Sequence, residues 1–170
     1  GLLDTKRTGT RITVNFGQAH DDWESIPLSR KTDTLHLDLS EGVLSDPVCV
    51  NIGNPHAVFF VKEIESVPLS KLGPKLETHA LFPENANIEA VQVINRNYLK
   101  VRVWERGVGI TQACGTGACA ALIAACRRGY ADRNAEVELC GGILFVEWRK
   151  DNQVLMTGPT ATSFTGTWQF

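Results

Sequence analysis

A cysteine at the start of an apolar segment is the residue in this sequence with the clearest capacity for chemistry. Cys114 precedes Gly115, Thr116 and Gly117, after which the chain reads ACAALIAACRR. Amide groups and the positive dipole end at a helix N-terminus lower the pKa of a thiol, so this context predicts a thiolate at Cys114 near neutral pH. A thiolate there would act as a base on carbon or as a nucleophile.

The small residues after this cysteine predict an anion site. Gly115, Thr116 and Gly117 leave backbone amides uncovered, and such amides at a helix start bind carboxylate or phosphate groups. A base beside a bound carboxylate would be suited to remove a proton from the neighbouring carbon. The residue pattern alone leaves a second interpretation open, since most free cysteines are inert packing residues.

Composition and charge exclude several classes of partner. The 170 residues are 43% hydrophobic, and 17 basic residues face 19 acidic ones, giving a net charge of −2. This balance favours neither nucleic acid nor a membrane surface as a partner, and the apolar content suits one compact domain or two small ones. The five cysteines lack the paired spacing of a zinc site or a disulfide framework, and no secretory signal opens the sequence. We therefore expect free thiols, no metal and a cytoplasmic location.

Alternating apolar residues predict a fold dominated by short, mostly antiparallel strands around one buried helix. The helix is expected at 117–128, where no polar face is left for solvent, and a weaker helix is expected at 66–79. The predicted strands cover 12–16, 34–39, 48–52, 57–61, 88–95, 98–105, 136–140, 141–148, 153–158 and a last run ending at Phe170.

Five polar residues near predicted turns and strand ends could belong to a site. Asn54 and His56 lie in a turn, Asn87 lies just before a strand, and Glu105 and Arg106 end another strand. Taken singly, each is explained as an ordinary turn, strand-end or surface residue.

The stretch ERGVGITQACGTGACA resembles the C-terminal active-site motif of the diaminopimelate epimerase family. NIGNPHAVFFV, LGPKLETHALFPENANIEAVQV and VRVWERG are similar to further blocks of that family in the same order, and the likeness is looser before about residue 45. The resemblance implies an α+β fold, a strongly bent mixed sheet or barrel around a central helix at 115–129. It also implies interconversion of LL- and meso-2,6-diaminopimelate without pyridoxal phosphate or metal.

The resemblance also implies a role for each matching residue. Cys114 matches one of two active-site cysteines, of which one removes the α-proton while the other delivers a proton to the opposite face. Gly115 and Thr116 match residues whose backbone amides hold the carboxylate at the reacting carbon.

The five polar residues match the remainder of the family's site. Arg106, Asn54 and Asn87 would grip the distal carboxylate end of the substrate, where a guanidinium suits a carboxylate. Glu105 and His56 would lie near the reacting ammonium group. A related racemase of the proline or hydroxyproline type, with a monocarboxylate substrate, is an alternative.

One departure from the family concerns the second cysteine. The family is built from two similar halves that each supply one cysteine, and this sequence resembles only the C-terminal half. None of the other cysteines precedes a glycine-rich helix start, and we expect them to be packing residues (Cys49, Cys119, Cys126 and Cys140). We therefore interpret 1–170 as a single domain that is inactive alone and whose partner is the N-terminal half. Its uncovered face favours a homodimer and leaves Cys114 open to oxidation. A non-catalytic binding domain of the same fold is the other alternative.

Overall fold

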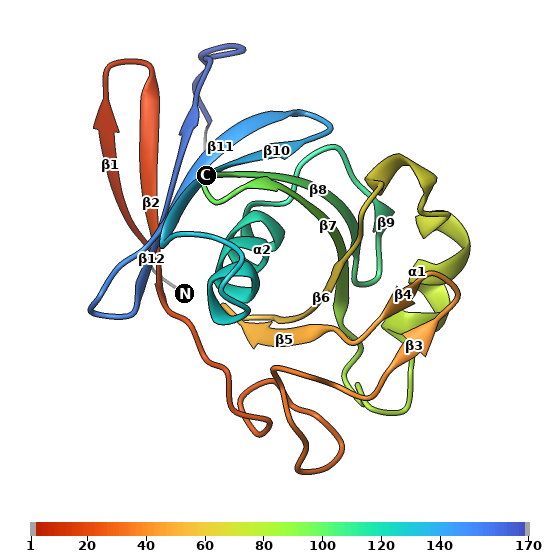
Figure 1. Ribbon diagram of the computed structural model, residues 1–170. Helices are drawn as coiled ribbons and strands as arrows, with labels where there is room; N and C mark the ends of the chain where they lie inside the picture. Colours follow the sequence, from red (N-terminus) through yellow and green to blue (C-terminus); the bar gives the residue numbers. More distant parts are fainter. Residues whose placement is uncertain (1–2, 169–170) are drawn as a thin grey trace.

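Ten strands form one curved sheet in the computed structural model, which describes residues 3–168 (Figure 1). Their order is β1-β2-β12-β11-β10-β8-β7-β6-β5, with β9 paired to β8; β10–β8 and β6–β7 are parallel and the other pairs are antiparallel. The strands are β1 (Asp4–Thr8), β2 (Arg11–Gln18), β5 (Val48–Asn51), β6 (Pro55–Phe60), β7 (Asn87–Asn95), β8 (Tyr98–Glu105), β9 (Gly109–Ile110), β10 (Asn134–Leu139), β11 (Gly142–Trp148) and β12 (Gln153–Pro159), and a separate hairpin joins β3 (Ser40–Glu41) to β4 (Leu44–Ser45).

The sheet closes around helix α2 (Gly115–Arg127), as Figure 1 shows. His20, two residues past β2, forms an antiparallel bridge with Asn51 at the end of β5. The His20 amide donates to the Asn51 carbonyl over 2.9 Å, and the Asn51 amide donates back over 2.8 Å. Because β5 is the last strand of the sheet and β2 lies near the other end, this bridge joins the two ends. The predicted bent mixed sheet around a central helix is confirmed.

Strands β5 and β6 are buried on both faces and separate two hydrophobic cores. Val50 and Val58 belong to the core that surrounds α2, whereas Cys49 and Phe59 belong to the core on the other face, beneath helix α1 (Leu69–Glu77). The alternation follows from the two-residue period of a strand. Each fully buried aliphatic or aromatic side chain contributes about 1.5–3 kcal/mol, so both cores hold the sheet in place.

Helix α2 matches its prediction closely. Residues 117–125 are all buried, as expected for a helix without a polar face. Its end is followed by Gly129, whose positive φ of 71° is a backbone conformation that glycine adopts without steric cost.

Three predicted elements differ from the structure. The segment 34–39 forms no strand: Leu37 and Leu39 are buried in the core beneath α1, but from an irregular stretch, so alternation there reflects packing alone. The helix expected at 66–79 divides into a 3-10 turn (Ile64–Ser66) and α1, because Pro68 at the junction has no amide hydrogen to donate. Residues 160–168 form no strand, and 169–170 lie outside the described residues.

Candidate active site

Cys114 is the residue that caps the N-terminus of α2. Its backbone is extended, and its Sγ accepts a hydrogen bond from the amide of Gly117 over 3.3 Å. A Cβ on Gly117 would lie 3.1 Å from a Val103 methyl carbon and 3.2 Å from both Cys114 Sγ and Glu89 Oε1. A larger residue would therefore push its neighbours aside by a few tenths of an ångström, and a buried carboxyl oxygen lies against the first turn of the helix.

The predicted thiolate at Cys114 is wrong for this chain. Cys114 is 7% exposed, and burial raises the pKa of its thiol to about 11. Hydrogen bonds from Thr116 and Gly117 lower the pKa of the thiol, and the charges of Glu89 and Glu105 raise it. Desolvation thus outweighs the helix end. The expectation that Cys114 is exposed and prone to oxidation is wrong for the same reason: the thiol keeps its proton and only 7% of the residue is accessible, so its sulfur reacts slowly.

Four of the predicted residues are joined by direct contacts. Asn54 lies in the turn between β5 and β6, whereas His56, expected in that turn, is the second residue of β6; Thr116 lies in the first turn of α2. The Asn54 amide nitrogen donates to Thr116 Oγ1 over 3.4 Å, and Thr116 Oγ1 lies 3.6 Å from Cys114 Sγ. His56 Nε2 lies 2.9 Å from Asn54 Oδ1. The structure therefore connects this turn to the helix start.

The other three predicted polar residues lie at the start of β7 and at the end of β8 or just after it. Asn87 is buried and is the first residue of β7, not the residue before the strand. Its Oδ1 accepts from the Arg106 amide over 2.9 Å. The exposed Arg106 guanidinium donates to the Glu84 carbonyl over 3.0 Å, while Glu105 accepts from the Thr111 hydroxyl. Glu105 and Arg106 thus have separate partners.

The structure adds two carboxylates that the sequence interpretation missed. Glu77, at the end of α1, accepts from the Trp104 indole over 2.6 Å and from the Gly107 amide over 2.8 Å, so it holds the loop that carries Arg106. Glu89 is fully buried in β7 and lies 2.6 Å from His56 Nδ1. A glutamate directly between apolar Ile88 and Ala90 was the available signal, because buried carboxylates are rare without a partner.

The other cysteines are free and lie elsewhere. Cys49 and Cys119 are fully buried and Cys126 is half-buried, which confirms packing positions for them. Cys140 is exposed, so its predicted packing role is wrong: β10 ends at Leu139, before its side chain could be covered.

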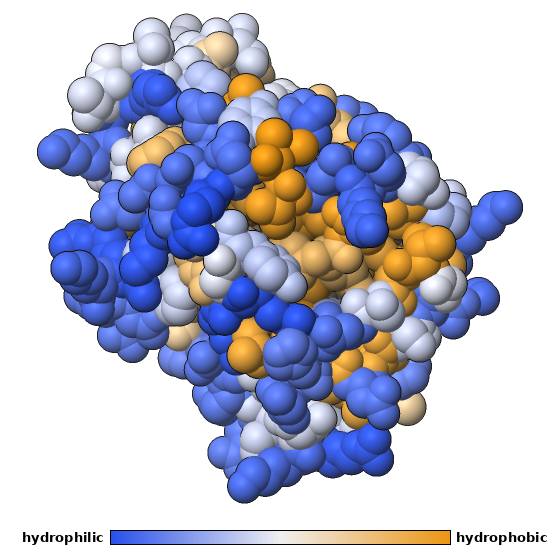
Figure 2. All heavy atoms as spheres, viewed as in Figure 1, coloured by the Kyte–Doolittle hydropathy of each residue, from blue (hydrophilic) through white to orange (hydrophobic). Residues whose placement is uncertain are grey.

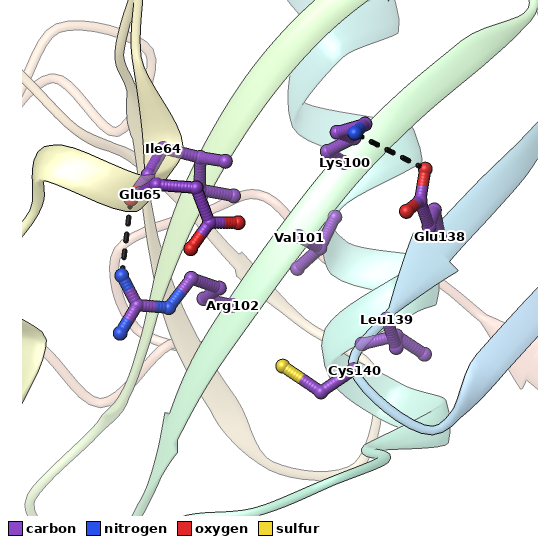
Figure 3. A pocket seen from close by; sticks show the side chains of 8 residues that line it. All are labelled: Ile64, Glu65, Lys100, Val101, Arg102, Glu138, Leu139 and Cys140. Carbon is purple, nitrogen blue, oxygen red and sulfur yellow. Dashed lines mark hydrogen bonds and ion pairs between the residues drawn. The ribbon is translucent and has the colours of Figure 1, made fainter.

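The pockets on the surface are lined by residues other than those around Cys114. Cys140, just after β10, lines a small pocket of about 60 Å³ with Lys100 and Glu138. Figure 3 shows that the other side chains lining this pocket come from β8, β10 and the 3-10 turn. A pocket of this size holds only a few water molecules. Figure 2 shows apolar residues gathered over the middle of one face, bordered by hydrophilic ones.

Between residues 3 and 168, no three side chains of His, Cys, Asp or Glu form a cluster that could hold a metal ion. In the same range, none of the helices has the length and apolar character needed to cross a membrane.

A barrel wound around a cysteine-capped helix places the chain in a class of solved epimerase and racemase folds. It matches a predicted epimerase from Pseudomonas aeruginosa with a TM-score of 0.58 and 19% identity, covering 92% of this chain and 58% of that one. It matches a hydroxyproline epimerase from Agrobacterium vitis with a TM-score of 0.61 and 12% identity, covering 92% and 52%. At these identities the likeness shows the fold alone.

Sequence comparison defines the family within this class. Residues 48–162 match the diaminopimelate epimerase family, and the chain belongs to it. The diaminopimelate epimerase of Rhodospirillum centenum is 53% identical over 167 residues, which are 98% of this chain and 57% of that protein. The family resemblance is confirmed, and the chain spans little more than half the length of this relative.

Proposed function

We propose that residues 1–170 are a single domain, the C-terminal half of a cytoplasmic diaminopimelate epimerase, in which Cys114 is one of two acid–base groups. The observation that carries this proposal is the Cys114 thiol at the N-terminus of a buried helix, within reach of the Gly117 amide and the Thr116 hydroxyl. The other half of the enzyme would supply the second cysteine, and this chain alone would be inactive. The family membership and the covered length support this interpretation.

The proton transfers follow from the state of the thiol. A thiol with a pKa of about 11 keeps its proton at neutral pH, which suits the acid that donates to a carbanion. In one direction, the thiolate of the other half would take the α-proton, and Cys114 would deliver its own proton to the opposite face of the carbon. In the reverse direction Cys114 would act as the base, and the bound substrate ammonium would lower its pKa.

The backbone at the helix start would hold the substrate carboxylate. Gly115 and Thr116 are the first two residues of α2, and their amides have no carbonyl one turn earlier to bond. A carboxylate bound there would gain from the positive end of the helix, and the same groups would stabilise the charge of the carbanion. This site requires no cofactor.

Arg106 would distinguish diaminopimelate from substrates with one carboxylate. Its guanidinium is exposed, and its backbone is fixed by Asn87. We propose that Arg106, with Asn87 and Asn54, grips the distal end of the substrate, and that Glu105 and His56 lie near the reacting ammonium. An arginine binds a carboxylate with two parallel hydrogen bonds, which a lysine cannot reproduce.

The proposal is tested by following α-proton exchange from LL-diaminopimelate in heavy water. The full-length protein that contains this chain is expected to exchange and epimerise, whereas the 170-residue chain alone is expected to do neither. Replacing Arg106 with Lys in the full-length protein is expected to raise the KM about a hundredfold, the loss of a charged bidentate contact.

The alternatives give different results in the same assay. Turnover of proline or hydroxyproline that is insensitive to Arg106→Lys would favour the related racemase, whose fold the hydroxyproline epimerase shares. Binding of diaminopimelate by the full-length protein without any proton exchange would favour a binding domain. Either result would contradict the proposed function.

A further inference from the structure

We propose that Glu89 is a positioning residue that acts through His56 to set the direction of a chain of hydrogen bonds ending at the Cys114 sulfur. The effect on turnover rests on the proposed function; the effect on the thiol does not. Glu89 belongs to β7 and is fully buried, so it would touch neither substrate nor the reacting atoms. Three side chains lie between it and Cys114 along the path of hydrogen bonds, although its Oε1 and the Cys114 sulfur both approach the same side of Gly117.

Five side chains form this chain of contacts, which we call the Glu89 relay. Glu89 Oε1 lies 2.6 Å from His56 Nδ1, and His56 Nε2 lies 2.9 Å from Asn54 Oδ1. The Asn54 amide nitrogen lies 3.4 Å from Thr116 Oγ1, which lies 3.6 Å from Cys114 Sγ. Glu89 and His56 are both fully buried, so water does not compete for the first contact.

The position of one proton decides which way the Glu89 relay points. Asn54 Oδ1 is an acceptor, so His56 Nε2 must carry a proton; His56 Nδ1 then shares a second proton with Glu89. The Asn54 amide donates to Thr116 Oγ1, which leaves the single Thr116 hydroxyl proton free to point at Cys114 Sγ. Every donor then points toward the sulfur, an arrangement that stabilises a thiolate.

Loss of that shared proton would reverse the Glu89 relay. With His56 protonated only on Nδ1, bare Nε2 would become an acceptor, and the Asn54 amide would turn to donate to it. Asn54 Oδ1 would then face Thr116, whose hydroxyl would donate to it instead of to the sulfur. Cys114 would lose its side-chain donor and keep its own proton.

The surroundings of Glu89 favour the state that keeps the shared proton. Glu89 Oε2 is buried and, among the described residues, has no hydrogen-bond partner. Burial raises the pKa of Glu89 and the charge of Glu105 raises it further, while His56 lowers it. The charged or titratable groups around the pair are Glu105 at the end of β8, Cys114 at the start of α2 and Cys49 in β5. An unpartnered buried oxygen next to a second carboxylate disfavours a bare negative charge.

The test measures the pH dependence of alkylation of Cys114 by iodoacetamide, followed by mass spectrometry of its peptide, in the full-length protein. Glu89→Gln keeps a donor to His56 Nδ1 through its amide, so the reaction rate is expected to stay within about threefold of the parent at neutral pH. Glu89→Leu removes that donor, so His56 is no longer held in the tautomer protonated on Nε2; alkylation is expected to slow by at most about tenfold, which is one unit in the apparent pKa of Cys114.

The last contact of the Glu89 relay supplies a pair of variants that are expected to fold, because Thr116 is only partly buried. Thr116→Val removes the donor to the sulfur and is expected to slow alkylation about as much as Glu89→Leu, whereas Thr116→Ser keeps the hydroxyl and the parent rate. The double variant Glu89→Leu with Thr116→Val is expected to be no slower than either single variant, because both break one pathway.

Opposite outcomes would overturn the inference. If Glu89 acts only as a buried negative charge, Glu89→Gln and Glu89→Leu would both speed alkylation, because the charge that raises the pKa of Cys114 is gone. Equal rates for Thr116→Val and Thr116→Ser would also overturn it, and this pair decides the matter if Glu89→Leu fails to fold.

Turnover separates a failure of this inference from a failure of the proposed function. In the parent enzyme, Glu89→Leu is expected to lower kcat about tenfold through the thiol, and the KM for diaminopimelate is expected to rise as well, because a reversed relay turns Asn54 and His56, which are proposed to contact the substrate. A parent that is inactive, with the alkylation pattern as expected, would contradict the proposed function and leave the Glu89 relay standing. An active parent whose Glu89 variants behave identically in both assays would contradict the relay alone.

Discussion

The two helices of this domain differ in how they begin and in what their first turns do. Helix α1 follows Pro68, has no side-chain cap, and packs one face, with Leu72 and Leu76, against the sheet. Helix α2 is buried on every side, and the Cys114 sulfur caps its first turn. A half-buried helix stabilises the domain through packing. A fully buried helix also places the free amides of its first turn and a capping thiol together at one site that is shielded from water.

The two helices nevertheless serve the same site. Glu77 at the C-terminal end of α1 fixes the loop beside Arg106, on the distal side of the proposed substrate site, while α2 holds Cys114 on the reacting side. The comparison predicts that changes at α2 affect turnover and that changes at α1 affect stability or substrate binding.

The largest expected effect is on turnover at the start of α2. Cys114→Ser in the full-length enzyme is expected to lower kcat/KM at least about a thousandfold, or about 4 kcal/mol of transition-state stabilisation, because a hydroxyl is a far weaker acid than a thiol. Steady-state epimerisation measures this. Cys140→Ser changes an exposed thiol outside the site and is the matched control, with unchanged activity expected. Equal effects of the two variants would remove Cys114 from the mechanism.

The next effect is on stability at α1. A Cβ on Gly73 would lie 2.5 Å from the Trp104 ring, so Gly73→Ala forces that ring to move. Overpacking of this kind costs about 1–3 kcal/mol in free energy of unfolding, measured by urea denaturation. In Gly117→Ala the new Cβ meets its neighbours at 3.1–3.2 Å, so this variant is expected to lose less free energy of unfolding than Gly73→Ala. It is expected to lose more epimerase activity, because Gly117 lies beside Cys114. A more stable Gly73→Ala variant would show that Trp104 has room to shift.

A smaller effect is expected on substrate binding through Glu77. Glu77→Leu removes both acceptors that hold Trp104 and the Gly107 amide, and the loop carrying Arg106 loosens. The KM for diaminopimelate is expected to rise about tenfold, or about 1.4 kcal/mol, with kcat nearly unchanged. Glu84→Gln is the control, because Arg106 uses the Glu84 backbone carbonyl and not its side chain. A fall in kcat with unchanged KM would show that Glu77 affects turnover, as the residues at the start of α2 are expected to do, and not substrate binding.

The last prediction compares the two ends of α2 through the pH dependence of stability. Burial raises the pKa of Cys114 at its start and of Cys126 near its end to about 11, from an ordinary value of 9.0. A raised pKa in the folded state means that the stabilisation is complete below pH 9 and is lost as the pH rises toward 11. The free energy of unfolding is therefore expected to fall over this range. Cys126→Ser should flatten the fall, and an unchanged slope would mean that Cys126 is solvated.

Much of the site could be predicted from the sequence because its signals are local. The apolar run after Cys114 predicts a buried helix and the glycines predict free amides at its start, and both hold in the structure. Periodicity likewise located most strands. It failed at 34–39, where alternating leucines are buried from an irregular segment, because burial alone produces the same pattern as a strand.

The sequence by itself determined the family and the buried helix α2 with the cysteine at its start. Only the tertiary structure decided the state of the thiol and the place of Glu89. The pKa of Cys114 depends on how completely distant strands exclude water from its sulfur, and Glu89 is joined to His56 through the parallel pairing of β6 with β7. Desolvation and contacts between strands depend on segments far apart in the chain, which local spacing does not encode.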